Sequence, residues 1–502
     1  MKGKIIHLIS KISNDYPIRG NIYIYVYLII ACIFLGRLFI VINDQLEAPF
    51  DLVYESPNLS TIKQIKAGNN PYEQDVYDNL PFNITIYTPL YHYITSLLPI
   101  LKGNPFFFGR IISLICMFVS SFVLFFVNKK NQLQALPFVA IGIFFSFWPV
   151  ISNTAFLKND PMALLFSVYS VLFVYHAKSN FRIVLSALFC VLALATKQSY
   201  ISSFITCLIY LFFSNRRNFY IFLVSISIFS LFFVLITILV WGSGFWFSTV
   251  FALRQEINFQ DGFSIFKHLL KQPIFCFLIG LTFFIFLNIL KKCPKKILTE
   301  SPYFIYVIIS GCILVLTVGK KGASTNYFFE FYLSQLMLII FVFRNIDSAS
   351  LKKPIFYFIT GIFVLCSIGE IKFARSFDYS FTNQKNISAK NVYYNTMTKE
   401  IDSLGIRNPI ILDIMTHVNI YSMTDNLYLN DPYLYNLLWE DKILDYKPLL
   451  TSIEEGYFDI IMLPSKTICN NRLDGPRKII VNEILNYYRL EKTGSNYNYY
   501  IR

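Results

Sequence analysis

Charged residues are scarce in this sequence. Only 15% of its 502 residues are Asp, Glu, Lys or Arg, whereas ordinary globular domains carry roughly 25%. In contrast, 55% of the residues are hydrophobic and 18% are aromatic, and the mean hydropathy is +0.51. A water-soluble chain of this length could not bury so much apolar surface, and a disordered chain would be more polar. The composition therefore excludes both classes and predicts a polytopic membrane protein.

The sequence also lacks the motifs of several enzyme classes. It contains no HExxH zinc motif, no P-loop, no GxGxxG after a strand and no nucleophile elbow. Its nine cysteines lie mostly inside apolar runs and show neither a disulfide framework nor a metal-binding spacing. The first apolar run continues past the length of a signal peptide, so we expect no cleavable signal.

Basic residues outnumber acidic ones and give a net charge of +14. They lie in short clusters between apolar runs, which is typical of membrane orientation, and we expect no nucleic-acid partner. The connections on one side of the predicted bilayer hold 17 Lys and Arg in about 55 residues, and those on the other side hold 10 in about 112. Because cytoplasmic connections carry the excess, we predict the N-terminus inside and the C-terminus outside.

A membrane span needs about 20 apolar residues, and we predict about eleven spans, several of them short. Segment 86–101 is not counted, because it is short, has a proline near each end, and by crossing would turn every later basic cluster outward. We expect it to lie along the outer leaflet or dip into it. The predicted spans are at about 21–42, 105–127, 133–150, 161–177, 183–196, 199–213, 219–241, 273–290, 301–318, 328–343 and 354–373.

The predicted fold class is mostly α, with a transmembrane domain at 1–374 whose first outer loop covers 44–104. The tail at 375–502 is nearly neutral, with 14 basic and 15 acidic residues, and is predicted to form an extracytoplasmic α/β domain. Its patterns predict strands at 409–415 and 457–464, a helix at 478–488 and an edge strand at 497–502.

Acidic residues gather in the first outer loop. Two of them, Asp51 and Glu55, lie among apolar and aromatic residues just after the first span. Their four-residue spacing puts both carboxylates on one face of a helix. At a membrane boundary such a pair can split its pKa values, so that one acts as a general base and the other orients a substrate or binds a metal. The alternative for the loop acids is a solvated surface without a catalytic role.

Two further outer residues have a catalytic and a structural interpretation. Asp160 precedes a proline at the start of a span, where it is either a functional acid or a helix N-cap. Lys197 lies between two short spans, where it either neutralises a phosphate or extends its ammonium to the membrane surface.

The connection at 319–330 combines glycine, small hydroxyls, two lysines and an amide, which favours contact with an anion or a sugar. Glu330 falls at the apolar boundary, where a lone acid is costly and usually functional. Arg110 lies near the outer end of the second span. The candidates in this connection are Lys321 for a phosphate, and Asn326, Tyr327 and Glu330 for a sugar or acceptor.

Several of these segments, taken in order, resemble the GT-C superfamily of integral-membrane glycosyltransferases. The most similar branch is the bacterial one related to aminoarabinose transferases and protein O-mannosyltransferases. The resemblance covers about residues 20–375, and the tail looks like the outer α/β domain of that group. It is carried by Asp51-Leu-Val-Tyr-Glu, Ala67-Gly-Asn-Asn-Pro-Tyr, Tyr87-Thr-Pro-Leu-Tyr, Asn159-Asp-Pro, Thr196-Lys-Gln and Lys321-Gly-Ala-Ser-Thr-Asn-Tyr-Phe-Phe-Glu.

The resemblance implies a polyprenyl-phosphate-linked sugar donor that reaches the site from the membrane lipid. It implies transfer to a glycan, lipid or protein acceptor on the outer face, with inversion. Asp51 then matches the base for the acceptor hydroxyl, Glu55 the nearby second acid and Asp160 the acid at the outer end of a later span. Relatives differ in metal use, so a divalent metal is left open, and no other cofactor is expected.

The Tyr87-Thr-Pro-Leu segment matches the stretch near the donor phosphate in this family. The lysine found there in some relatives is absent here. Lys197, Lys321 and Arg110 are therefore the candidate phosphate contacts, with Tyr87 beside them.

Other interpretations fit the sequence less well. A transporter or flippase of lipid-linked glycans would distribute charges through its spans, whereas here the acids gather at one face. An O-antigen-type ligase would have a large late outer loop, and a sensory protein would leave the first-loop acids without a purpose. We therefore predict a membrane glycosyltransferase, of the hexosyl- or pentosyltransferase class, in a bacterial inner membrane, and keep the flippase as the alternative.

Overall fold

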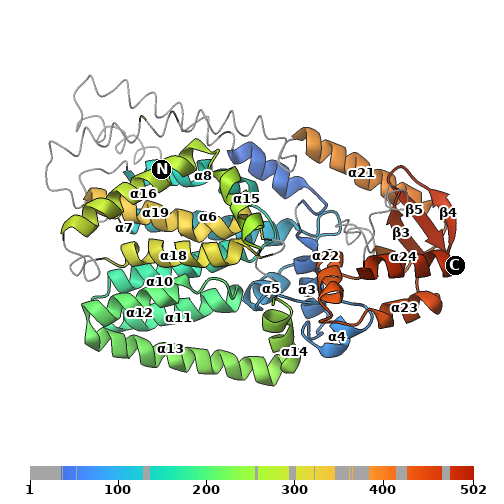
Figure 1. Ribbon diagram of the computed structural model, residues 1–502, viewed down its shortest axis with the longest axis horizontal. Coiled ribbons are helices and arrows are strands. Elements are labelled where there is room, and N and C mark those ends of the chain that lie inside the picture. The colour runs from blue at the N-terminus through green and yellow to red at the C-terminus, as the bar shows by residue number, and fades with distance from the viewer. Residues whose placement is uncertain are drawn as a thin grey trace.

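The chain forms a bundle of long helices and a smaller C-terminal part with a β-sheet, with the first loop between them (Figure 1). The first loop contains α3 (Ser56–Lys66), α4 (Gln74–Asp78) and α5 (Leu90–Ser96). This computed structural model describes residues 36, 38–52, 54–127, 136–254, 258–292, 301–320, 323–344, 361, 365, 384–413, 427–465 and 475–502.

The bundle helices run roughly parallel in Figure 1, because their apolar surfaces pack into one continuous core. Most predicted spans coincide with helices, although several of these spans are divided into two helices by an interruption. The helices are α6 (Phe107–Ser121), α7 (Val123–Val127), α8 (Leu136–Ser146), α9 (Trp148–Asn153), α10 (Asp160–Tyr175), α11 (Asn180–Thr196), α12 (Ser202–Ser214), α13 (Arg216–Ile236), η2 (Thr237–Trp241), α14 (Ser243–Trp246), η3 (Phe247–Phe251), α15 (Phe259–Leu269), α16 (Pro273–Lys292), α18 (Pro302–Val318), η4 (Thr325–Tyr327) and α19 (Phe328–Arg344).

Three stretches of helix are long and apolar enough to cross a membrane: Phe107–Val127, Arg216–Trp241 and Thr325–Arg344. A fourth candidate is the pair Gly262–Leu269 and Pro273–Leu287, bent by 98°. Five shorter apolar helices of 10–17 residues accompany them in the described part of the chain. The predicted spans at 21–42 and 354–373 lie mostly outside the described residues. The number of eleven spans and the orientation therefore stay predictions.

The outer face of α13 is apolar and uncovered. Ile228, Leu231 and Phe232 are 59%, 61% and 64% exposed, and Leu239 in the following turn is 81% exposed. A continuous apolar face of this length is unfavourable in water but suits contact with lipid chains. This surface agrees with the membrane prediction made from composition.

The segment at 86–101 contains only the seven-residue helix α5. At 1.5 Å per residue this helix is roughly 10 Å long, about a third of the hydrocarbon core. It packs against α3 of the same loop. The segment is therefore too short to cross the bilayer as a helix.

The C-terminal part is an α/β unit with a five-stranded sheet in the order β2-β1-β3-β5-β4. Strand β1 pairs in parallel with β2 and β3, and β5 pairs antiparallel with β3 and β4. The elements are α21 (Gln384–Asp402), β1 (Ile411–Asp413), β2 (Leu427–Tyr428), α22 (Pro432–Glu440), α23 (Lys447–Glu454), β3 (Ile460–Pro464), α24 (Gly475–Tyr487), β4 (Arg489–Thr493) and β5 (Tyr497–Ile501).

The predicted strands and the predicted helix of this tail are confirmed, but the edge position of the last strand is wrong. Strand β5 lies between β3 and β4, and its residues Tyr497, Tyr499 and Tyr500 are buried. The edge is taken by β4, whose charged residues are mostly exposed. Charged side chains on an edge strand oppose pairing with other chains. This explains why β4, and not the tyrosine-rich β5, lies at the edge of the sheet.

The first loop packs directly against the C-terminal part. Tyr77, Phe82 and Ile84 belong to the same apolar core as Tyr435 of α22. The Asn430 amide also pairs with the Ile84 backbone, accepting from its N–H at 3.1 Å and donating to its C=O at 3.0 Å. The loop is therefore a structural layer between the bundle and the tail.

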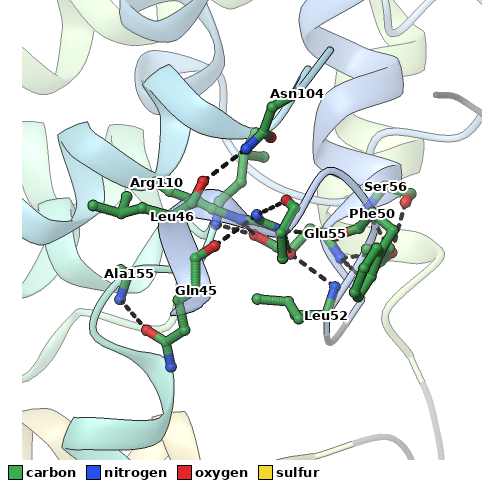
Figure 2. Close-up of polar contacts among 12 residues, drawn as sticks. Gln45, Leu46, Phe50, Leu52, Glu55, Ser56, Asn104, Arg110 and Ala155 are labelled. Carbon is green, nitrogen blue, oxygen red and sulfur yellow. Dashed lines mark hydrogen bonds and ion pairs between the residues drawn. The ribbon is translucent and has the colours of Figure 1, made fainter. Parts of the chain in front are cut away.

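The other side of the loop is attached to the bundle by a buried ion pair. Arg110 of α6 donates two hydrogen bonds to the Glu55 carboxylate, from Nε at 2.8 Å and from Nη2 at 2.5 Å (Figure 2). Its remaining donors bond to the carbonyls of Gln45, Ala48 and Phe50. These bonds account for all five N–H groups of the guanidinium.

The Glu55 carboxylate is equally saturated. It also accepts hydrogen bonds from the backbone N–H groups of Leu52 at 3.0 Å and Leu157 at 2.7 Å. Both partners of the pair are completely buried. The pair therefore fixes the start of the first loop, α6 and the chain entering α10 in one arrangement.

Replacement of Arg110 tests this attachment. Arg110→Met leaves the buried Glu55 carboxylate without its counter-charge, and we expect a loss of about 3–5 kcal/mol in the free energy of unfolding. The measurement is denaturant unfolding of the purified protein in detergent.

The control is Lys178→Gln at an exposed site, which should change the free energy of unfolding by less than about 0.5 kcal/mol. The double variant Glu55→Gln/Arg110→Met should be more stable than Arg110→Met alone, because no unpaired charge remains. If Arg110→Met unfolds like the control, the pair does not hold the loop.

Candidate functional site

A cavity of about 460 Å³ lies where the bundle, the first loop and the C-terminal part meet. Its walls come from α3, residues 84–87, the start of α10, the α11–α12 connection, the α18–α19 connection and the start of α22. In Figure 1 these elements gather at the end of the bundle that faces the sheet. Segments far apart in the sequence thus form the walls of one cavity.

An ion pair forms the centre of the bundle side of this cavity. Lys197 Nζ lies 2.8 Å and 2.9 Å from the two carboxylate oxygens of Asp160. The Asn326 amide donates to Asp160 Oδ2 at 2.9 Å. The ammonium also lies over the rings of Tyr327 at 4.7 Å and Tyr87 at 5.1 Å. Five residues singled out in the sequence are therefore brought together here.

The arrangement decides between the interpretations of Asp160 and Lys197. Asp160 is the first residue of α10 and makes no capping hydrogen bond, and Lys197 is only 2% exposed. Burial lowers the pKa of Lys197, but the Asp160 carboxylate and the two tyrosines outweigh it and hold the pKa above its ordinary value. Asp160 and Lys197 therefore form a buried ion pair. Asp160 does not cap the helix, and the Lys197 ammonium does not extend to the membrane surface.

Two other lysines line the cavity without a carboxylate partner. Lys158 donates to Asn153 Oδ1 at 3.4 Å, and burial lowers the pKa of its ammonium. Lys320 lies at the end of α18. Neither makes an ion pair with any residue that the structure describes. Lys321, the predicted phosphate contact, lies outside the described residues, next to Lys320.

A second acid, Asp431, reaches the cavity from the C-terminal part, and the sequence analysis missed it. The Tyr54 hydroxyl donates to Asp431 Oδ1 at 2.5 Å, and the same oxygen accepts from the Leu434 backbone N–H at 2.9 Å. Burial raises the pKa of Asp431 to about 6. One signal could have found it, because Asn430-Asp431-Pro432 repeats the tripeptide Asn159-Asp160-Pro161.

Tyr54 itself has an uncommon backbone conformation. Its φ of 58° lies in the left-handed region, which costs a residue with a side chain of this kind about 1–3 kcal/mol. The conformation directs the Tyr54 ring to the cavity wall and its hydroxyl to Asp431. Such strain is common where side-chain placement serves a site.

Four of the predicted site residues do not line the cavity, and three of them lie close together at the start of the first loop. Glu55 and Arg110 bind each other below the first loop, as described above. Asp51 is buried and accepts hydrogen bonds from Glu55 N, Ser56 N and Ser56 Oγ, at 3.0, 3.0 and 2.6 Å. It thereby satisfies free N–H groups at the start of α3. Burial and the nearby Glu55 raise the pKa of Asp51. Its role as base stays a prediction.

Glu330 also lies away from the cavity. It is buried in α19 and accepts hydrogen bonds from Ser167, from Ser202 at 2.9 Å and from Tyr306 at 2.9 Å. Three hydroxyl donors compensate for the cost of its burial. Its proposed contact with a sugar or acceptor stays a prediction.

For a metal ion, the carboxylates are poorly arranged. In the described ranges, no three His, Cys, Asp or Glu side chains converge in a group that could hold a metal. The two cavity acids are engaged with Lys197 and with Tyr54 respectively.

Comparison with known proteins identifies solved structures with a similar fold. No protein-family model matches the sequence, and no curated protein sequence matches it significantly. Solved structures do match. ArnT from Cupriavidus metallidurans bound to undecaprenyl phosphate has a TM-score of 0.60 at 9% identity, covering 94% of this chain and 97% of that one. The apo state of the same ArnT has a TM-score of 0.60 at 10% identity, covering 93% and 97%. The chain thus has the fold of ArnT, which confirms the resemblance to aminoarabinose transferases at the level of fold.

Proposed function

We propose that this protein is a membrane glycosyltransferase that moves a sugar from a polyprenyl-phosphate donor to an acceptor on the outer face of a bacterial inner membrane. The observation that carries the proposal is the cavity with its Asp160–Lys197 centre, at the end of a bundle with an ArnT-like fold. One of the two ArnT structures contains undecaprenyl phosphate, and a donor of the same class fits the chemistry of this cavity.

The leaving group of such a reaction is a phosphate, which needs cations beside it. Lys158 and Lys320 have no carboxylate partner among the described residues and are the contacts we propose. Lys197 adds positive charge, although Asp160 shares it. Arg110, one of the sequence-based candidates, is fully occupied by Glu55 and three carbonyls. Lys321 stays a candidate beside Lys320.

The sugar would be recognised by amide oxygens in the cavity wall. Asn159 Oδ1, Gln198 Oε1 and Asn326 Oδ1 are buried and lack a hydrogen-bond partner in the described structure. Buried polar atoms normally have a hydrogen-bond partner. Three free acceptor oxygens around one cavity therefore favour a ligand that brings hydroxyl donors. A sugar supplies such donors at close spacing. With Tyr327 beside them, these residues form the proposed sugar contact.

The reaction we propose proceeds with inversion. The acceptor oxygen attacks the anomeric carbon from the side opposite the phosphate, while a carboxylate takes the hydroxyl proton. The sequence favours Asp51 as this base, and Asp160 and Asp431 are the carboxylates that line the cavity. The lysines on the bundle side balance the charge that develops on the departing phosphate.

Deletion of the gene tests the proposed reaction. We expect one sugar to disappear from a surface glycan, lipid or glycoprotein while its polyprenyl-phosphate donor accumulates, because the donor is made but not consumed. Mass spectrometry of surface glycans and polyprenyl-linked sugars measures both. If whole lipid-linked glycans accumulate on the inner face instead, the protein moves lipids across the bilayer and is not a transferase.

The proposed phosphate contacts can be tested with undecaprenyl phosphate itself. Lys158→Gln and Lys320→Gln should each weaken its binding to the purified protein about tenfold, because each removes a charged hydrogen bond worth roughly 1.5 kcal/mol. Native mass spectrometry in detergent measures the bound fraction. Lys178→Gln, which removes an exposed lysine, serves as the matched control. Equal binding by all three variants and the wild type would exclude these contacts.

A further inference from the structure

The two acids that line the cavity differ in the availability of their oxygens. Both oxygens of Asp160 are occupied, by Lys197 on each and by Asn326 on Oδ2. Asp431 uses only Oδ1, for Tyr54 and for the Leu434 N–H. Its Oδ2 has no hydrogen-bond partner among the residues that the structure describes. Asp431 is therefore the cavity acid with an oxygen free to accept a proton.

The cations and this open carboxylate come from different parts of the fold. Lys158, Lys197 and Lys320 come from the ends of bundle helices, where a lipid-linked phosphate would arrive. Asp431 comes from the start of α22, which lies on the C-terminal side of the first loop (Figure 1). A displacement with inversion needs the base and the leaving group on opposite sides of the anomeric carbon. The lysines and Asp431 reach the cavity from different parts of the fold, which is consistent with this requirement.

We propose that Asp431 of the C-terminal part is the catalytic base that takes the proton of the acceptor hydroxyl. This inference rests on the proposed transferase function and assigns one residue of it. The acceptor O–H bond breaks and its proton goes to Asp431 Oδ2. The acceptor oxygen bonds to the anomeric carbon, and the carbon–oxygen bond to the phosphate breaks, leaving its electron pair on the polyprenyl phosphate.

The surroundings of Asp431 suit a base that works near neutral pH. Burial raises its pKa to about 6, and the Tyr54 hydrogen bond limits the rise. Asp51 lies near enough to raise the pKa of Asp431. The charged and titratable groups that line the cavity with it are Tyr54, Tyr87, His92, Lys158, Asp160, Lys197, Lys320, Tyr327 and Tyr433. A carboxylate of this kind is ionised at neutral pH and still basic enough to accept a proton.

Asp431→Asn tests the proposal with little risk to the fold. Asp431 caps α22, and asparagine is an equally good N-cap. We expect the transfer rate to fall at least about 100-fold, the usual contribution of a general base, with unchanged thermal stability. Asp441→Asn, an exposed acid at the other end of α22, is the matched control and should retain the wild-type rate.

The assay uses membranes of the deletion strain, in which the donor accumulates. Purified wild-type or variant protein is added, and mass spectrometry follows the conversion of the polyprenyl-linked sugar to polyprenyl phosphate. If the wild type converts none, the proposed function fails and this inference fails with it. If the wild type is active and Asp431→Asn keeps its rate within threefold, Asp431 is not the base and only this inference fails.

The pH dependence gives a second readout that a purely structural role would not move. Because the base acts when ionised, the wild-type rate should rise with pH through a midpoint near 6. Tyr54→Phe removes a hydrogen bond that stabilises the ionised form, so the midpoint should move to higher pH by roughly one unit. An unchanged midpoint in Tyr54→Phe would contradict the assignment of this titration to Asp431.

Discussion

The buried pair of Arg110 and Glu55 is the constraint on which the site depends. Its seven hydrogen bonds leave no free donor on the guanidinium and join three segments that are distant in the sequence. An unpaired charge at this depth would be very unfavourable, so the loop has one stable position relative to the bundle. Tyr54 immediately precedes Glu55, and its strained conformation is therefore held by a rigid neighbour.

From that fixed loop the cavity follows. The loop attaches on one side to the bundle and on the other to the core of the C-terminal part. Cations and amides come from the bundle, and a second acid comes from the start of α22. In the proposed reaction, a lipid-linked donor and a water-exposed acceptor would enter from different surroundings, and each would meet the chemistry it needs. In this account the C-terminal part completes the catalytic site and does not merely cover it.

The sequence predicted much of this architecture, because apolar runs and charge clusters report directly on burial and membrane contact. Asp160, Lys197, Tyr87, Asn326 and Tyr327 were found because polar residues at the ends of apolar runs are conspicuous. The partners of Glu55 and Arg110 could not be predicted, since they are 55 or more residues apart or are backbone groups fixed only by folding. Asp431 was missed because an Asp-Pro pair in a polar tail has the pattern of an ordinary helix start. The central position of β5 could not be predicted, because the sequence of a single strand does not determine which strands pair with it.

The proposed function requires that this cavity holds the phosphate of a polyprenyl lipid. Cryo-electron microscopy of the full chain in lipid nanodiscs, with undecaprenyl phosphate added, tests it most directly. We expect phosphate density in the cavity, within hydrogen-bonding distance of Lys158 or Lys320 and near the Asp160–Lys197 pair. Phosphate density outside the cavity, with the cavity itself unchanged, would contradict it.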